Sequence, residues 1–224
     1  MSLEFDPKNM PFRRLGPSGL RVPIFCLGGW LTLGGTVTGD PVKEIIKVAF
    51  ENGINMFDTA EAYAKGRSEL EMGRVIKELG LRRNDLIITT KLFWGLKDGP
   101  NDTGLSRKHI IEGTKDCLER LQLDYVDVIF AHRPDASGEL FPTFDLTLES
   151  MLISHFSAHG RNSSGFQLGH RKGMGSFDKL FLRRFLTNAQ QAFYWATSEW
   201  SAQEIEAAHR TSLVKLGGFI NDPV

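Results

Sequence analysis

The sequence predicts an α/β fold in which parallel strands alternate with helices, and three observations support this prediction. Apolar runs with the length of buried strands occupy residues 54–57, 86–90 and 125–131. Segments of helical periodicity separate these runs, so strands recur roughly every 30–40 residues, as in consecutive β/α units. Each run ends on an ionisable residue, which is Asp58, Lys91 or His132. Reactive groups of parallel α/β folds gather at such strand ends.

The composition is that of an ordinary globular chain without a charge bias. Its 224 residues are 41% hydrophobic, and 27 basic residues balance 27 acidic ones. This balance gives no support for a nucleic acid or an anionic membrane as a partner. No apolar run approaches the ~20 residues of a membrane span, and residues 1–11 do not resemble a signal peptide. We therefore expect a cytoplasmic protein without membrane insertion.

Two cysteines, Cys26 and Cys117, lie within apolar segments. We expect both to be buried free thiols, which suits a reducing compartment.

The first elements of the chain are predicted to be short. Residues 12–15 and 20–22 flank a Gly-Pro-Ser-Gly sequence and predict a β-hairpin. A brief strand is expected at 24–27, followed by the glycine-rich run 28–35, which lacks the spacing of a phosphate-binding loop. This run is either a flexible loop or a backbone that a flat ligand can approach, with Trp30 beside it.

Capping signals predict where the helices begin. The expected starts are Asp40-Pro41, a capping box of Ser68 with Glu71, the N-cap Ser106, and a second capping box of Ser201 with Glu204. Gly53 and Gly80 end the first two helices. In the third, Cys117 and its apolar neighbours at helical spacing are expected to face the core.

Residues 138–191 break the β/α rhythm. No helical or alternating period is apparent there, and glycine, serine and histidine interrupt every candidate element. His155 and His159 stand four residues apart but lack the glutamate of a zinc-protease helix, so no metal site is predicted. We expect an atypical, disordered insertion.

Four residues make a candidate proton-donating site: Asp58, Tyr63, Lys91 and His132. Taken singly, each has an ordinary explanation, because strand-end aspartates often sit in turns, loop tyrosines pack on the surface, lysines are solvated, and a lone histidine indicates little. Together they place a phenol, an ammonium, a carboxylate and an imidazole at one end of the predicted sheet. Their combination favours a catalytic site.

Several longer motifs now point to a known family. They are GINMFDTAEAY at 53–63, TTKLFWG at 89–95, GLSRKHIIEG at 104–113, DYVDVIFAHRPD at 124–135 and YWATSEWS at 194–201. Together they resemble the aldo-keto reductases, and most closely the branch that includes voltage-gated potassium channel β subunits and their fungal relatives. The resemblance covers residues 12–135 almost continuously and then 192 to about 209.

The resemblance implies a (β/α)₈ barrel that reduces aldehydes or ketones to alcohols with NADPH. Tyr63 would be the general acid, Lys91 would stabilise its phenolate, Asp58 would hold Lys91, and His132 would orient the substrate carbonyl. Animal channel β subunits carry asparagine at the His132 position, so this chain keeps the fuller enzymatic set.

The resemblance also implies which residues lie near the nicotinamide. The positions that match are Gly29, Trp30, Asp58 and Ser198.

The chain departs from the family after residue 137. One amphipathic helix normally joins the fourth and fifth strands, and three further β/α units supply the groups that bind the cofactor phosphate. We therefore expect a single incomplete barrel domain over residues 1–224 that lacks the last units. For 138–191 the alternatives are a genuine insertion and a gene-model artefact, such as a translated intron followed by a frameshift near Arg210. We favour the artefact, because residues 138–191 show no apolar pattern that predicts helices or strands.

Two functions follow from the resemblance. The first is NADPH-dependent reduction of a small carbonyl substrate, which leaves open whether this shortened chain is itself active. The second is that of a channel β-type regulatory subunit with a redox-sensing cofactor site. Full-length relatives would act as homo-oligomers or as channel-associated subunits. We expect the 224-residue chain to bind NADPH weakly or not at all.

Overall fold

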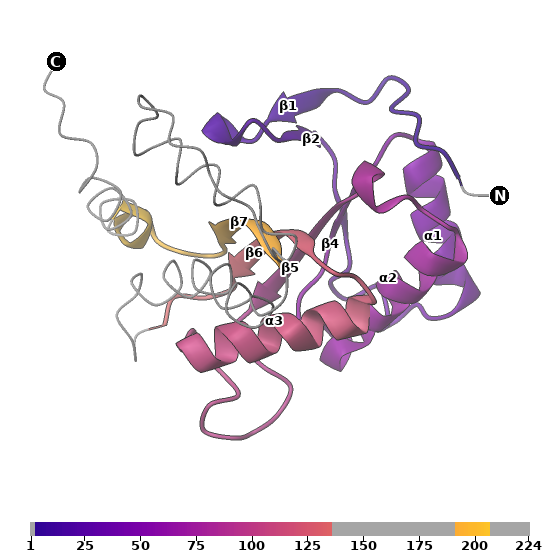
Figure 1. Ribbon diagram of the computed structural model, residues 1–224. Coiled ribbons are helices and arrows are strands. Elements are labelled where there is room, and N and C mark those ends of the chain that lie inside the picture. The colour runs from indigo at the N-terminus through magenta and orange to yellow at the C-terminus, as the bar shows by residue number, and fades with distance from the viewer. Residues whose placement is uncertain (1–2, 136–190, 207–224) are drawn as a thin grey trace, which may run out of the picture.

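A five-stranded parallel sheet forms the centre of the molecule (Figure 1). The structure is a computed structural model that describes residues 3–135 and 191–206. The strands are β3 (Leu27–Gly28), β4 (Met56–Asp58), β5 (Ile87–Leu92), β6 (Val126–Ala131) and β7 (Ala192–Thr197). They lie side by side in chain order. The predicted α/β fold with parallel strands is confirmed.

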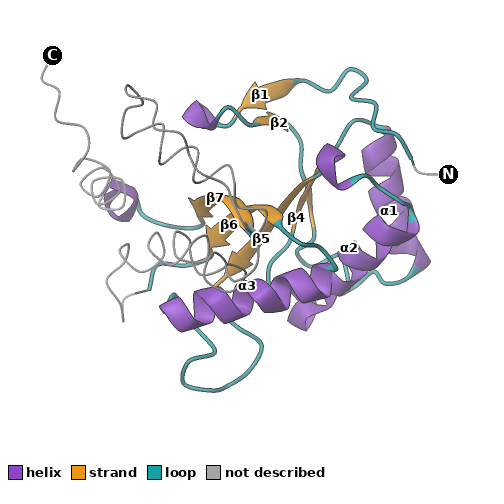
Figure 2. Ribbon diagram, in the orientation of Figure 1, coloured by secondary structure: helices purple, strands orange, loops and turns teal. Residues whose placement is uncertain are grey.

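Three helices cover one face of this sheet (Figure 2). They are α1 (Asp40–Glu51), α2 (Arg67–Glu78) and α3 (Arg107–Leu121). Alternate strand residues, including Phe57, Ile88 and Ile129, point to this face and are fully buried with apolar helix residues. Apolar burial of this kind is the main favourable contribution to folding. Because strand side chains alternate, the residues between them point to the opposite face, where the candidate site lies.

An antiparallel hairpin packs at one end of the sheet, as the sequence predicts. It consists of β1 (Phe12–Arg14) and β2 (Arg21–Pro23), joined through the 3-10 turn η1 (Gly16–Ser18). The Tyr194 hydroxyl of β7 donates to the Ser18 carbonyl at 3.3 Å, which ties the hairpin to the far strand of the sheet.

Among the described residues the sheet is open. β3 pairs only with β4, and β7 pairs only with β6, so these two strands are its edges. Five strands that do not close on themselves agree with the expected partial barrel.

The predicted bounds of the strand at 24–27 and the predicted burial of Cys26 are wrong. The strand is Leu27–Gly28, and Ile24 and Phe25 before it are exposed. Cys26 is exposed as well, whereas Cys117 is buried as predicted. The segment around Cys26 is apolar, but it leads into β3, an edge strand that pairs only with β4 among the described residues.

The capping box predicted for Ser68 and Glu71 is also wrong. α2 begins one residue earlier, after Gly66, whose φ of 81° is left-handed. Ser68 instead accepts from the Thr59 hydroxyl at 3.1 Å, and Glu71 accepts from the Gly39 backbone N–H at 3.2 Å. Both side chains are engaged in tertiary contacts that local sequence does not reveal.

The N-cap predicted at Asp40 is wrong as well, because Gly39 is the N-cap of α1 and Asp40 is already helical without a capping hydrogen bond. The remaining two predicted caps are confirmed. The Ser106 hydroxyl accepts from the His109 N–H at 3.1 Å and so caps α3. Ser201 and Glu204 exchange two hydrogen bonds of 2.7 and 3.2 Å at the start of a helix at 202–206.

Several expectations fall outside the described residues. These are residues 138–190 of the insertion expected at 138–191, with His155 and His159, and the frameshift near Arg210.

Candidate active site

Asp58 and Lys91 meet at the carboxyl ends of β4 and β5. The Lys91 ammonium donates to the Asp58 carboxylate and, at 2.9 Å, to the Thr59 carbonyl. The other Asp58 oxygen accepts from the Thr89 hydroxyl at 2.5 Å. The parallel register sets Asp58 opposite Thr89, so these side chains share the face opposite the helices. The ammonium is therefore held in one place by two acceptors.

Tyr63 reaches the same place from the loop after β4. It begins the short turn η2 (Tyr63–Gly66), and its ring centre lies 4.8 Å from Lys91 Nζ. Lys91 also faces the ring of Phe130 from β6 at 5.6 Å. A cation between two aromatic faces is in a favourable electrostatic position. It can also stabilise a negative charge that develops on the phenol oxygen.

The backbone that follows Tyr63 is strained. Ala64 and Lys65 have φ values of 50° and 56°, and Gly66 continues the left-handed run at 81°. Non-glycine residues pay about 1–2 kcal/mol each in this region. Such strain persists only where the surrounding contacts determine the conformation. The position of Tyr63 therefore depends on contacts that hold this turn.

His132 completes the cluster from the end of β6. Its ring lies edge-on to Tyr63, with 5.8 Å between the ring centres, and it is 7% exposed. Burial, together with the positive charges of Lys91 and Arg133, lowers the pKa of His132 to about 4. At neutral pH the ring is therefore uncharged and can donate one hydrogen bond to a carbonyl oxygen. Its Nδ1 atom is buried and finds no hydrogen-bond partner among the described residues.

The residues predicted near the nicotinamide differ in their exposure and packing. Trp30 is 66% exposed. Gly29 is buried, and a Cβ there would meet Ser68 Oγ at 2.5 Å, so this glycine allows close packing against α2. Its contact with the nicotinamide stays a prediction. Gly28 is the open position, because nothing lies within 4 Å of a Cβ added to it and it pairs with Asp58 in the sheet.

Ser198 follows β7 and is half-buried. Its backbone N–H donates to the Ala131 carbonyl at 3.1 Å, which places it beside the strand that carries His132. Gly28 and Ser198 therefore border the four-residue cluster from opposite edges of the sheet.

Three contributors to the site are not among the residues predicted from the sequence. Trp94 packs edge-on to His132, with ring centres 6.5 Å apart, and Arg133 lies 5.7 Å from the Trp94 ring. Glu61 is a buried carboxylate two residues before Tyr63. All three lie inside the quoted motifs, so their positions within those motifs are the signal that could have identified them.

Residues 3–135 and 191–206 contain neither a candidate metal site nor a candidate membrane-spanning helix. These ranges hold no group of three or more histidine, cysteine, aspartate or glutamate side chains arranged to bind a metal. Their helices are also too short or too polar to cross a bilayer.

Comparison with known proteins agrees with the motifs. The family model described as "Aldo/keto reductase family" matches residues 25–217. A protein of Arabidopsis thaliana described as "Probable voltage-gated potassium channel subunit beta" is 41% identical over 218 residues, which are 96% of this chain and 55% of that protein. A protein of Schizosaccharomyces pombe described as "Putative voltage-gated potassium channel subunit beta" is 46% identical over 207 residues, 92% of this chain and 50% of that protein. The chain thus spans about half the length of the curated relatives it matches.

Proposed function

Because this chain belongs to the aldo/keto reductase family, we propose that it carries the proton-donating half of an NADPH-dependent reductase of aldehydes or ketones. One observation supports this most strongly. The Lys91 ammonium pairs with Asp58 and faces the Tyr63 ring, and His132 lies against the same ring. An acid, a charge that stabilises its conjugate base, and a neutral hydrogen-bond donor therefore meet at one point.

Each of the four residues has a role in the reduction. NADPH, when bound, supplies the hydride that attacks the carbonyl carbon. The Tyr63 hydroxyl then gives its proton to the carbonyl oxygen as the C=O bond becomes a C–O bond, and the product is an alcohol. Lys91 stabilises the phenolate left on Tyr63, and Asp58 keeps Lys91 in place. His132 donates to the carbonyl oxygen and orients it.

The neutral state of His132 matters for this assignment. A protonated imidazole would add a second positive charge beside Lys91, and the low pKa of His132 avoids this at neutral pH. Lys91 is therefore the cation that faces the Tyr63 ring, where the oxygen acquires charge. In active sites the surroundings commonly set which groups are protonated at the working pH.

Binding of the nicotinamide would use the open backbone at Gly28 and the neighbouring Asp58, Trp30 and Ser198. We assign the phosphate groups of the cofactor to none of the described residues. For that reason we propose carbonyl reduction for a complete domain of this family, and the proposal does not include turnover by the 224-residue chain itself.

A second candidate is supported by the names of the relatives. Two proteins that are 41% and 46% identical are described as potassium channel β subunits. We infer that the chain also has the framework of a channel-associated regulatory subunit, in which a nicotinamide at this site would report redox state. Co-purification with the cytoplasmic domain of a channel separates the two candidates. Absence of association at micromolar concentration leaves the reductase alone.

Reduction of a panel of aldehydes, followed by NADPH absorbance, tests the first candidate. It should be run on this chain and on the full-length Schizosaccharomyces pombe relative, each with and without Tyr63→Phe or its counterpart. Loss of the general acid should lower the rate about 10²–10⁴-fold.

Tyr125→Phe is the matched control. Tyr125 stacks against Arg83, 3.8 Å from the ring centre, and a phenylalanine ring keeps that contact. An unchanged rate in Tyr63→Phe, or an equal loss in Tyr125→Phe, would refute the assignment of Tyr63.

A further inference from the structure

Glu61 is among the most deeply buried charged residues of the described part of the chain, with 2% of its surface exposed. One carboxylate oxygen accepts from the backbone N–H groups of Phe93 and Gly95, at 2.6 and 2.8 Å. The carboxylate also contacts Nε2 of His109 from α3 at 3.3 Å. Glu61 belongs to the loop after β4, whereas these partners belong to the turn after β5 and to a helix. One side chain therefore joins three separate segments.

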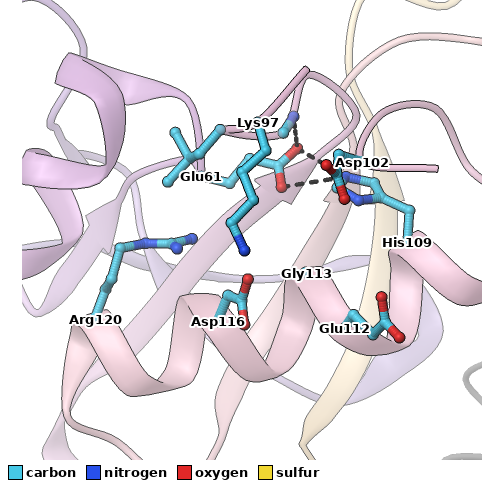
Figure 3. A pocket seen from close by; sticks show the side chains of 10 residues that line it. Glu61, Lys97, Asp102, His109, Glu112, Gly113, Asp116 and Arg120 are labelled. Atoms are coloured by element: carbon cyan, nitrogen blue, oxygen red, sulfur yellow. Dashed lines mark hydrogen bonds and ion pairs between the residues drawn. The ribbon is translucent and has the colours of Figure 1, made fainter. Parts of the chain in front are cut away.

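A small cavity lies beside Glu61 (Figure 3). Its volume is about 210 Å³, and Glu61 and His109 are among the residues that line it. The carboxylate points toward His109 of α3. Gly113 of the same helix also lines the cavity.

The electrostatics favour an ionised carboxylate at this place. Burial alone would raise the pKa of Glu61, but the hydrogen bonds from His109, Phe93 and Gly95 outweigh it, and the pKa lies below its usual value. Hydrogen bonds to a charged group are stronger than neutral ones, and losing such an acceptor leaves buried donors unsatisfied. The contacts of Glu61 therefore resist displacement.

These contacts lie directly beside the strained turn that carries Tyr63. The Glu61 backbone N–H donates to the Lys91 carbonyl at 3.1 Å, and the Tyr63 N–H donates to the Ala60 carbonyl at 3.1 Å. The left-handed residues begin immediately afterwards, at Ala64. Glu61 is thus the last firmly anchored residue before the phenol and its strained turn.

We propose that Glu61 is a positioning residue, whose carboxylate locks the loop of Tyr63 to the turn of Trp94 and to α3 and so fixes the phenol beside Lys91. The proposal rests on the proposed reductase function for its catalytic consequence. Its structural consequence, the placement of the Tyr63 ring, can be measured without turnover.

The chain suits such a measurement because it contains only three tyrosines. The chain labelled with ¹³C at the tyrosine Cζ should give three signals, and Tyr63→Phe identifies the one from Tyr63. Glu61→Ala should shift this signal and accelerate amide hydrogen exchange at Phe93 and Gly95. Glu61→Gln should behave nearly as the wild type, because a single oxygen accepts both N–H groups and glutamine keeps an oxygen there.

Asp127→Ala is the matched control for loss of stability. Asp127 is likewise a buried carboxylate that accepts a backbone N–H, from Ile88 of β5 at 2.7 Å, and pairs with Arg83. It lies at the opposite end of the strands from Lys91, so its removal should destabilise the fold but leave the Tyr63 signal in place.

The kinetic arm uses the same variants. Where the wild type turns over aldehyde, Glu61→Ala should lower kcat about 10–100-fold with little change in the KM for NADPH, since small displacements of reacting groups cost this much. Glu61→Gln should restore most of the rate.

The outcomes distinguish the two claims. An unshifted Tyr63 signal in Glu61→Ala, or an equal shift in Asp127→Ala, overturns the positioning role whether or not the chain is active. A shifted signal in a chain in which Tyr63→Phe leaves the rate unchanged supports the positioning of Tyr63 and refutes the reductase function instead.

Discussion

The Lys91 ammonium donates to the Asp58 carboxylate, which lies 33 residues earlier in the chain and at the end of the neighbouring strand. The Lys91 side chain is 8% exposed and that of Asp58 is 25% exposed. Removal of one member of a buried pair leaves the other charge uncompensated, which costs about 3–5 kcal/mol where both are fully buried. This pair is partly open, so its loss should cost less.

We therefore expect Asp58→Asn to lower the free energy of unfolding by about 2–3 kcal/mol. Denaturant unfolding measures this change. The control is Glu112→Gln, because Glu112 forms an exposed pair with Lys108 on α3, with both side chains about half exposed. Such helix pairs contribute only about 0.3–0.5 kcal/mol. Similar effects of the two substitutions would show that Asp58 does not hold Lys91.

His132 should make stability depend on pH. Its pKa is lowered to about 4, whereas an unfolded histidine titrates near 6.5. Between these values the unfolded chain binds a proton that the folded chain does not. Stability therefore rises with pH in this window, and up to about 3 kcal/mol is lost as the pH falls from about 6.5 to 4.

Comparison with His132→Asn isolates this contribution. Carboxylates such as Glu61 and Glu69 also have shifted pKa values, but they titrate in both proteins. The unfolding free energy of the variant should vary less with pH between 4 and 6.5. Parallel curves for the two proteins would mean that His132 is not held neutral by its surroundings.

Close packing of α2 on α3 should make Gly73 intolerant of substitution. A Cβ at this position would lie 2.3 Å from the Leu121 carbonyl oxygen and 2.5 Å from its carbon. Alanine normally stabilises a helix by about 1 kcal/mol relative to glycine. Overpacking against backbone costs about 1–3 kcal/mol or more, so Gly73→Ala should be destabilising on balance.

Gly113→Ala is the matched substitution in the neighbouring helix. Its nearest neighbour is the side-chain atom Leu92 Cδ2 at 3.1 Å, which can move more easily than backbone. Thermal unfolding of both variants should show the larger loss for Gly73→Ala. Equal melting temperatures would show that the two helices can separate at little cost.

The 224-residue chain should bind NADPH weakly or not at all. The described residues offer contacts near the nicotinamide, and the resemblance places the phosphate-binding groups in later β/α units. Nicotinamide fluorescence during titration measures the affinity, with the full-length Schizosaccharomyces pombe relative as the positive control. Saturable binding at micromolar concentration by a monodisperse monomer would contradict this expectation and would assign phosphate contacts to residues within 138–191.

Strand order and family membership could be predicted from the sequence because their signals are local. The apolar runs that end at Asp58, Lys91 and His132 become the neighbouring strands β4, β5 and β6. Parallel strands joined by helices point the same way, so the ends of three successive runs must lie side by side. The predicted grouping of these residues follows from that geometry, and their catalytic roles stay predictions.

Tertiary contacts decided the points on which local patterns misled. Ser68 and Glu71 have the spacing of a capping box, yet Thr59 and Gly39 are their partners. Cys26 lies in an apolar segment, yet it is exposed beside an edge strand. Ser68 and Glu71 bond to residues of other segments instead of to their own helix. Cys26 is exposed because β3 has a paired strand on one side only among the described residues.

The sequence by itself therefore determined which residues end the strands and which family the chain resembles, because periodicity and motifs are written in consecutive residues. Only the tertiary structure decided that Glu61 is buried against Phe93, Gly95 and His109, and that His132 is held neutral. Burial and charge environment depend on segments that meet only after folding, so no local pattern encodes them.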